Sequence, residues 1–175
     1  MFSIRRGVFE TNSSSSHSLV ILKDDAVEQE NNSLYFTHDE MLDSLRSFHE
    51  TTGVYDASKE DWYFGRAPFR ALDTFELKFQ YAYASEFDRD TLIELLKELI
   101  PEVTRFIPST DLGTDDCMLH YWLDEHGITM KEFLTCKKYI VIQDGDEYCI
   151  WSRLIKSGLI DMNVIENSEE QPHEK

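Results

Sequence analysis

The residues best suited to chemistry lie in one short polar segment near the N-terminus. Between residues 10 and 17 the chain carries a carboxylate, an amide, four serine hydroxyls and an imidazole, from Glu10, Asn12, Ser13, Ser14, Ser15, Ser16 and His17. A histidine with a pKa of about 6.5 can donate or accept a proton at neutral pH, and a nearby carboxylate can fix its tautomer and raise its basicity. We therefore expect Glu10, Asn12 and His17 to be catalytic.

Two cations precede this segment. Arg5 and Arg6 could neutralise a phosphate, and the serine hydroxyls with the backbone N–H groups of a tight turn could hold its oxygen atoms. Arg5, Arg6 and the four serines are thus the expected substrate-binding residues for phosphodiester or phosphoryl chemistry. Acyl transfer by a serine ranks lower, because the chain has no Gly-x-Ser-x-Gly motif. The alternative is a plain solvated loop, as serine-rich tracts often are.

Apolar residues on both sides argue against a plain loop. Val8 and Phe9 precede the tract and residues 19–22 follow it, so both ends would be anchored in a core, which a flexible linker does not need. Asp144 and Asp146 could join Glu10 around a divalent metal ion. Hairpin geometry alone also explains Asp144-Gly145, so we predict no metal-ligand set and leave the cofactor open.

Two other groups of residues have weaker claims. Asp115 and Asp116 precede His120 at the spacing of a helical turn, but an acidic first turn on an exposed face explains them equally. The aromatic run at residues 62–64 could stack a nucleobase. We expect it instead to anchor a core or an interface.

The charge balance limits the partners. The chain has 34 Asp and Glu against 17 Lys and Arg, a formal charge of −17, and contains no Lys- or Arg-rich run. Since affinity for nucleic acid comes from cations that displace counterions, direct binding should be weak. The complementary partner is a basic nucleic-acid-binding protein.

Cysteines and hydropathy indicate the compartment. Cys117, Cys136 and Cys149 are odd in number and lack paired or zinc-binding spacing, which favours a reducing cytoplasm. The sequence contains neither an apolar run long enough to cross a membrane nor a readable secretory signal, so we expect a cytoplasmic protein without a membrane partner.

Hydrophobic periodicity predicts both helices and strands. We expect strands at residues 19–22, 33–37, 103–107, 139–142 and 147–151, the last two joined by a hairpin at Asp144-Gly145. Helices are expected at residues 39–49, 72–87, 88–100, 115–126 and 129–136; residues 72–87 also alternate as a strand would. Residues 24–32, 55–69 and 108–114 should be loops. The fold class is α+β, a single domain over residues 1–165 with a small, mostly antiparallel sheet and several amphipathic helices, followed by a disordered acidic tail at 166–175.

Two blocks resemble a known family. Residues 6–18, which read RGVFETNSSSSHS, are similar to the opening signature of a family of small proteins from Firmicutes and their phages, and residues 132–147 are similar to its second block. The chain also resembles phage anti-CRISPR proteins that disable Cas9 by trimming its guide RNA. This resemblance implies a phage-encoded ribonuclease that acts in the bacterial cytoplasm.

Three hypotheses follow. The first is a guide-RNA-cleaving inhibitor of Cas9 that uses the N-terminal site. The second is a non-enzymatic acidic inhibitor that imitates nucleic acid and blocks a basic groove. The third, a nucleotide-using transferase, lacks a P-loop, a GxGxxG motif and a kinase signature.

Overall fold

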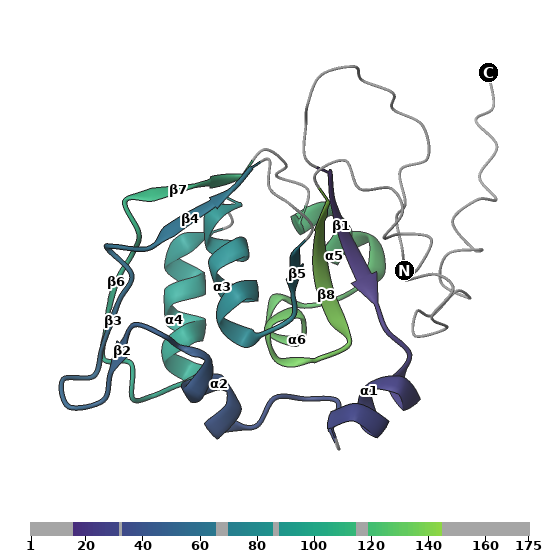
Figure 1. Ribbon diagram of the computed structural model, residues 1–175, viewed down its shortest axis with the longest axis horizontal. Coiled ribbons are helices and arrows are strands. Elements are labelled where there is room, and N and C mark those ends of the chain that lie inside the picture. The colour runs from purple at the N-terminus through teal and green to yellow at the C-terminus, as the bar shows by residue number, and fades with distance from the viewer. Residues whose placement is uncertain (1–15, 32, 66–69, 86–87, 115–118, 145–175) are drawn as a thin grey trace.

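The computed structural model combines short helices with small sheets, which confirms the α+β class (Figure 1). It describes residues 16–31, 33–65, 70–85, 88–114 and 119–144. The helices are α1 (Asp24–Asn31), α2 (His38–Ser44), α3 (Phe75–Ala84), α4 (Arg89–Leu99), α5 (Leu119–His126) and α6 (Met130–Thr135). The strands are β1 (Ser16–Ile21), β2 (Phe48–His49), β3 (Val54–Asp56), β4 (Asp61–Phe64), β5 (Arg70–Leu72), β6 (Arg105–Ile107), β7 (Asp111–Thr114) and β8 (Tyr139–Asp144).

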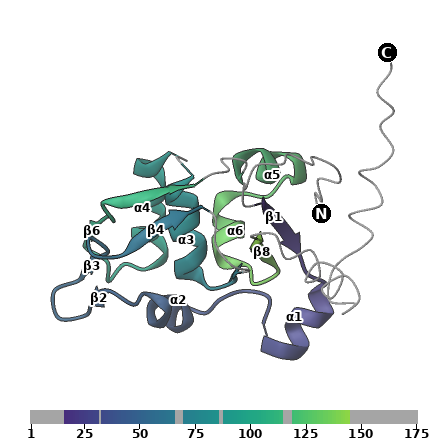
Figure 2. The ribbon, with the colours of Figure 1, turned by 45° about the horizontal axis from the view of Figure 1, so that its top comes forward.

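The strands form three small sheets. The first is antiparallel with the order β1-β8-β5, as the sequence predicted for the main sheet. The second has the order β2-β3-β6, in which β2 and β3 are antiparallel while β3 and β6 are parallel. The third is the parallel pair of β4 and β7. Figures 1 and 2 show α3 between the first sheet and the other two.

Helix α3 is the centre of the core. Every one of its residues is buried, and its N-terminus is capped by Thr74, whose side chain accepts a hydrogen bond from the N–H of Leu77. Phe79 lies within 6.5 Å, ring centre to ring centre, of four aromatic rings contributed by β3, β4, β6 and α3 itself. Because all faces of the helix are covered, apolar residues follow no single period, which explains the ambiguity of the sequence here.

Two ionisable groups of α3 are buried in this core. The ammonium of Lys78 donates to the carbonyls of Phe133 and Cys136, at 3.2 and 2.7 Å, where α6 ends, and burial lowers the pKa of Lys78 to about 7. The carboxylate of Glu76 accepts from the hydroxyl of Tyr55 and from the backbone N–H of Arg46, while burial raises its pKa. Their hydrogen bonds tie α3 to α6 and to the segment after α2.

Several helices were predicted correctly. Helices α3, α4, α5 and α6 lie within the expected ranges, with Thr129 as the N-cap of α6 and Gly127 at φ 61° directly after α5. Strands β1, β6 and β8 also match expected strands.

Other local predictions are wrong. Residues 24–32 were expected to be a loop, but residues 24–31 form α1, a mostly polar helix that buries Val27. Residues 33–37 form no strand and contribute one isolated bridge, from Tyr35 to Cys136. Helix α2 ends at Ser44, and Phe48 and His49 belong to β2 because they pair with β3. The expected loops at 55–69 and 108–114 contain β3, β4 and β7, each held by a partner distant in sequence.

Some predictions concern residues that the structure does not describe, namely the strand at 147–151, the hairpin turn and the tail at 166–175. Within the described part of the chain, none of the helices is long and apolar enough to span a bilayer.

Candidate functional site

His17 lies on the inner side of β1, facing α3. Its side chain is 5% exposed, and Nδ1 is 3.1 Å from the hydroxyl of Tyr81 and 3.3 Å from Oγ1 of Thr114, both hydrogen-bonding distances. The imidazole and the Tyr81 ring meet edge to face, with centres 5.4 Å apart at 78°. Tyr81 is in the last turns of α3 and Thr114 ends β7, so three separate elements fix the position of the imidazole.

Two polar residues continue the row across the sheet. His17 is directly opposite Gln143 on β8, and Gln143 is opposite Arg70 on β5. Since residues opposite one another on neighbouring strands project to the same face, the imidazole, the amide and the guanidinium share one side of the sheet. We call His17, Gln143 and Arg70 the polar row.

The two further members of the row are also fixed by contacts. The buried side chain of Gln143 donates a hydrogen bond from Nε2 to the carbonyl of Gly65. The guanidinium of Arg70 lies 5.7 Å from the centre of the Phe64 ring, a cation–π distance. Partial burial of the guanidinium lowers the pKa of Arg70, with a smaller contribution from Arg46, but an arginine keeps its charge at any physiological pH.

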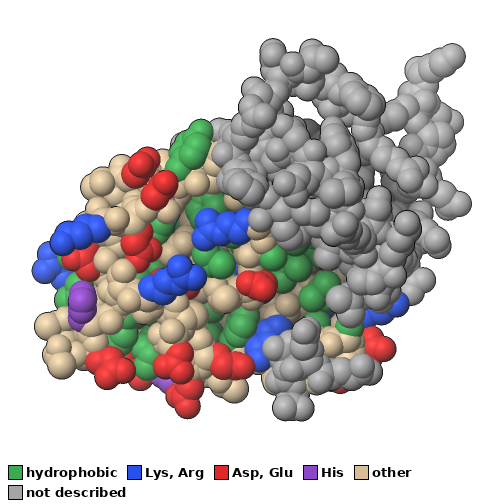
Figure 3. All heavy atoms as spheres, in the orientation of Figure 1, with side chains coloured by type: hydrophobic (Ala, Val, Ile, Leu, Met, Phe, Trp, Pro, Cys, Tyr) green, Lys and Arg blue, Asp and Glu red, His purple; other side chains and the backbone are tan. Residues whose placement is uncertain are grey.

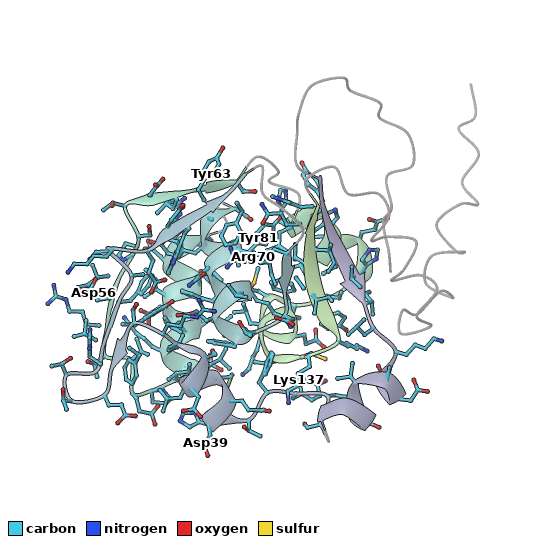
Figure 4. All side chains as sticks on the ribbon, in the orientation of Figure 1. Asp39, Asp56, Tyr63, Arg70, Tyr81 and Lys137 are labelled. Atoms are coloured by element: carbon cyan, nitrogen blue, oxygen red, sulfur yellow. The ribbon has the colours of Figure 1, made fainter. Side chains whose placement is uncertain are left out.

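Several chain segments meet at this end of the molecule. Ser16 of β1 pairs with Asp144 of β8, and Phe64 of β4 pairs with Thr114 of β7. Figure 4 shows Arg70 and Tyr81 together at the upper ends of α3 and β5, beside the start of β1. The N-terminal polar segment is thus joined covalently to the polar row, since it continues into Ser16 and His17.

The arrangement offers the parts of a phosphate-handling site. An imidazole can transfer protons, a guanidinium can neutralise phosphate oxygens, and hydroxyl and amide groups can orient them. Among the described residues there is no group of three or more His, Cys, Asp or Glu side chains that could hold a metal ion.

Of the expected catalytic and substrate-binding residues, only His17 has a described side chain. Ser16 is placed by its backbone at the start of β1. The remaining candidates lie outside the described residues: Arg5, Arg6, Glu10, Asn12, Ser13, Ser14 and Ser15. The expected pairing of Glu10 with His17 therefore stays a prediction.

Sequence reasoning missed the partners of His17. Tyr81 and Thr114 belong to segments predicted as a helix and a loop, and they lie 64 and 97 positions from His17. Gln143 carried a usable signal, because it is a lone amide directly after the apolar run of residues 140–142. Arg70 carried none, since the segment before it shows no sustained period.

The weaker sequence candidates have separate outcomes. In the aromatic run, Trp62 and Phe64 are buried in the core, as expected, whereas Tyr63 is 53% exposed. The ring of His120 packs on Tyr121 at 3.9 Å between centres. Asp115, Asp116 and Asp146 lie outside the described residues.

The chain was compared with known protein families, curated proteins and solved structures. No family model matches the chain, and neither a curated protein nor a solved structure is significantly similar to it.

Proposed function

We propose that this protein is a phage-encoded inhibitor of Cas9 that cleaves RNA phosphodiester bonds at the polar row, with the nuclease-bound guide RNA as substrate. The observation that carries the proposal is the alignment of His17, Gln143 and Arg70 on three neighbouring strands, with the Tyr81 hydroxyl on the imidazole. The choice of Cas9 rests on the resemblance to phage anti-CRISPR proteins, the N-terminal signature supports the phage origin, and the site operates in the cytoplasm of the bacterial host.

The chemistry needs one proton acceptor and one anion-stabilising group. The imidazole of His17 takes the proton of a ribose 2′-hydroxyl, and the 2′-oxygen attacks the adjacent phosphorus. The bond from phosphorus to the 5′-oxygen breaks, which leaves a 2′,3′-cyclic phosphate and, once that oxygen regains a proton, a 5′-hydroxyl. Arg70 neutralises the charge that develops on the phosphate oxygens. Glu10 assists His17, Asn12 and the serines orient the phosphate, and Arg5 and Arg6 add positive charge.

The surface charge favours RNA that another protein presents. Several of the few cations already pair with acidic side chains, among them Lys97, Lys131, Lys137 and Lys138. Lys78 is fully buried. The acidic excess is therefore displayed at the surface, and Figure 3 shows acidic side chains gathered along the lower edge of one face, over α2. Such a surface repels bare RNA and attracts a basic protein that holds it.

The test incubates Cas9 and end-labelled guide RNA with the protein and resolves the RNA on a denaturing gel. Wild type is expected to shorten the guide, while Arg70→Ala and His17→Ala leave it intact. Arg105→Ala and His49→Ala are the matched controls, because both residues are exposed on other strands. These two variants should cleave the guide as the wild-type protein does. Arg70 is itself exposed, so its variant should fold even if the buried His17 is needed for stability.

A second candidate is a non-enzymatic inhibitor whose acidic surface blocks a basic groove. The observation that favours it is the burial of His17, since a general base must meet its substrate. In the same assay this mode gives full inhibition with an intact guide, and rising salt weakens the complex. An intact guide with no inhibition would refute both candidates.

A further inference from the structure

The parallel pair β4–β7 has an inner and an outer face. Trp62 and Phe64 point inward and are buried, whereas Asp61 and Tyr63 alternate with them and are exposed. Because Asp61 is paired with Asp111 and Tyr63 with Gly113, the outer face presents two carboxylates at one end and an aromatic ring at the other. The Cα atoms of Asp61 and Tyr63, two positions apart along the strand, are separated by about 6 to 7 Å.

Two glycines make room for the ring of Tyr63. A Cβ atom built on Gly65 would overlap with Cε1 of Tyr63, and one built on Gly113 would lie 3.4 Å from Cδ2. The ring therefore rests on the backbone of both strands, and its side chain is still 53% exposed. Figure 4 shows Tyr63 at the upper edge of the molecule, beyond β4 and β7.

A backbone group of β4 holds the side chain of Asp61 in place. Oδ1 of Asp61 accepts a hydrogen bond from the backbone N–H of Tyr63 at 2.8 Å, which fixes the carboxylate at the start of the strand. Asp111 is opposite on β7 and is exposed as well. The face thus joins a flat aromatic surface to two anions.

We propose that this outer face of β4 and β7 binds an arginine side chain of a basic partner protein. The guanidinium stacks on the ring of Tyr63, and its N–H groups donate to Asp61 and Asp111. Arginine fits better than lysine, because its planar, weakly hydrated cation can stack and donate to carboxylates together. A nucleic-acid strand fits worse, since two carboxylates repel its phosphates. The inference rests on the proposed docking to a basic partner and names the contact that recognises it.

The test measures direct binding of a fluorescent octa-arginine peptide by anisotropy, with octa-lysine as the comparison. Tyr63→Ala is expected to weaken octa-arginine binding about threefold, in keeping with an exposed cation–π contact, and Asp61→Asn with Asp111→Asn should weaken it further. The matched control is Tyr121→Ala, because Tyr121 is a similarly exposed tyrosine on α5. This variant should bind the peptide as the wild-type protein does.

Equal binding by the Tyr63→Ala and Tyr121→Ala variants would overturn the inference. Preference for a single-stranded RNA oligonucleotide that depends on Tyr63 would also overturn it. The outcome is separable from cleavage. If the guide stays intact while octa-arginine binding depends on Tyr63, the nuclease proposal fails and the arginine site stands. If the guide is cut while Tyr63→Ala leaves peptide binding unchanged, the arginine site fails and the nuclease proposal stands.

Discussion

The buried ammonium of Lys78 should make the protein more stable as the pH rises from 7 to 9. In the folded state burial lowers the pKa of Lys78 to about 7, whereas in the unfolded chain it returns to about 10.4. Between these values the unfolded state binds more protons, so the free energy of unfolding increases with pH. Integrating the linkage relation from pH 7 to pH 9 gives a gain of about 2 kcal/mol.

Urea denaturation at both pH values, followed by circular dichroism, measures this gain. Lys78→Met removes the titrating group and should abolish the Lys78 part of the pH dependence, although it also deprives the carbonyls of Phe133 and Cys136 of a donor and shifts the whole curve downward. Lys97→Met on α4 is the control and should keep the wild-type slope. An equal increase in wild type and Lys78→Met would show that Lys78 has an ordinary pKa, and would refute the reasoning.

Three further variants test the fold. Phe79→Ala empties the centre of the aromatic core and should cost about 3 to 5 kcal/mol in urea denaturation; a loss below about 1 kcal/mol would contradict its central position. Thr129→Ala removes the capping box of α6 and should cost about 1 kcal/mol, with a matching loss of hydrogen-exchange protection in that helix. Burial raises the pKa of Glu76, so the folded state keeps this proton to a higher pH than the unfolded chain does, and the wild-type protein loses stability as the pH rises through that interval. Glu76→Gln should abolish this part of the pH dependence. A pH profile unchanged by the substitution would argue against the raised pKa.

The helices could be predicted because their signals are local. Thr129 and Glu132 form a capping box within four residues, and Gly127 has the positive φ that ends α5. Length favoured a helix for α3, even though its buried aromatic residues also alternate. Helix α1 was missed because its residues are mostly polar, and among residues 24–28, whose burial the structure describes, Val27 is the one that is buried.

The short parallel strands could not be predicted from local sequence. Val54 pairs with Arg105 and Asp61 pairs with Asp111, so each partner lies about 50 residues away. Strands of three or four residues carry too little alternation to stand out, and their hydrogen bonds form only when distant segments pack on the same helix.

The sequence allowed His17 to be predicted as a candidate site residue, but it did not allow its neighbours in the structure to be predicted. His17 stood out as an imidazole beside hydroxyls and a carboxylate in sequence. Its hydrogen bonds to Tyr81 and Thr114, and its place in a row with Gln143 and Arg70, depend on strand register and helix packing. The spacing of residues in the sequence does not predict which distant residues will contact His17.

The most direct measurement of the central claim is the chemistry of the RNA ends. Guide RNA bound to Cas9 would be incubated with the protein, and the fragments would be analysed by mass spectrometry. Proton abstraction from the 2′-hydroxyl by His17, with Arg70 on the phosphate, is expected to leave a 2′,3′-cyclic phosphate on one fragment and a 5′-hydroxyl on the other. Fragments with a 3′-hydroxyl and a 5′-phosphate, or a guide that remains whole, would contradict it.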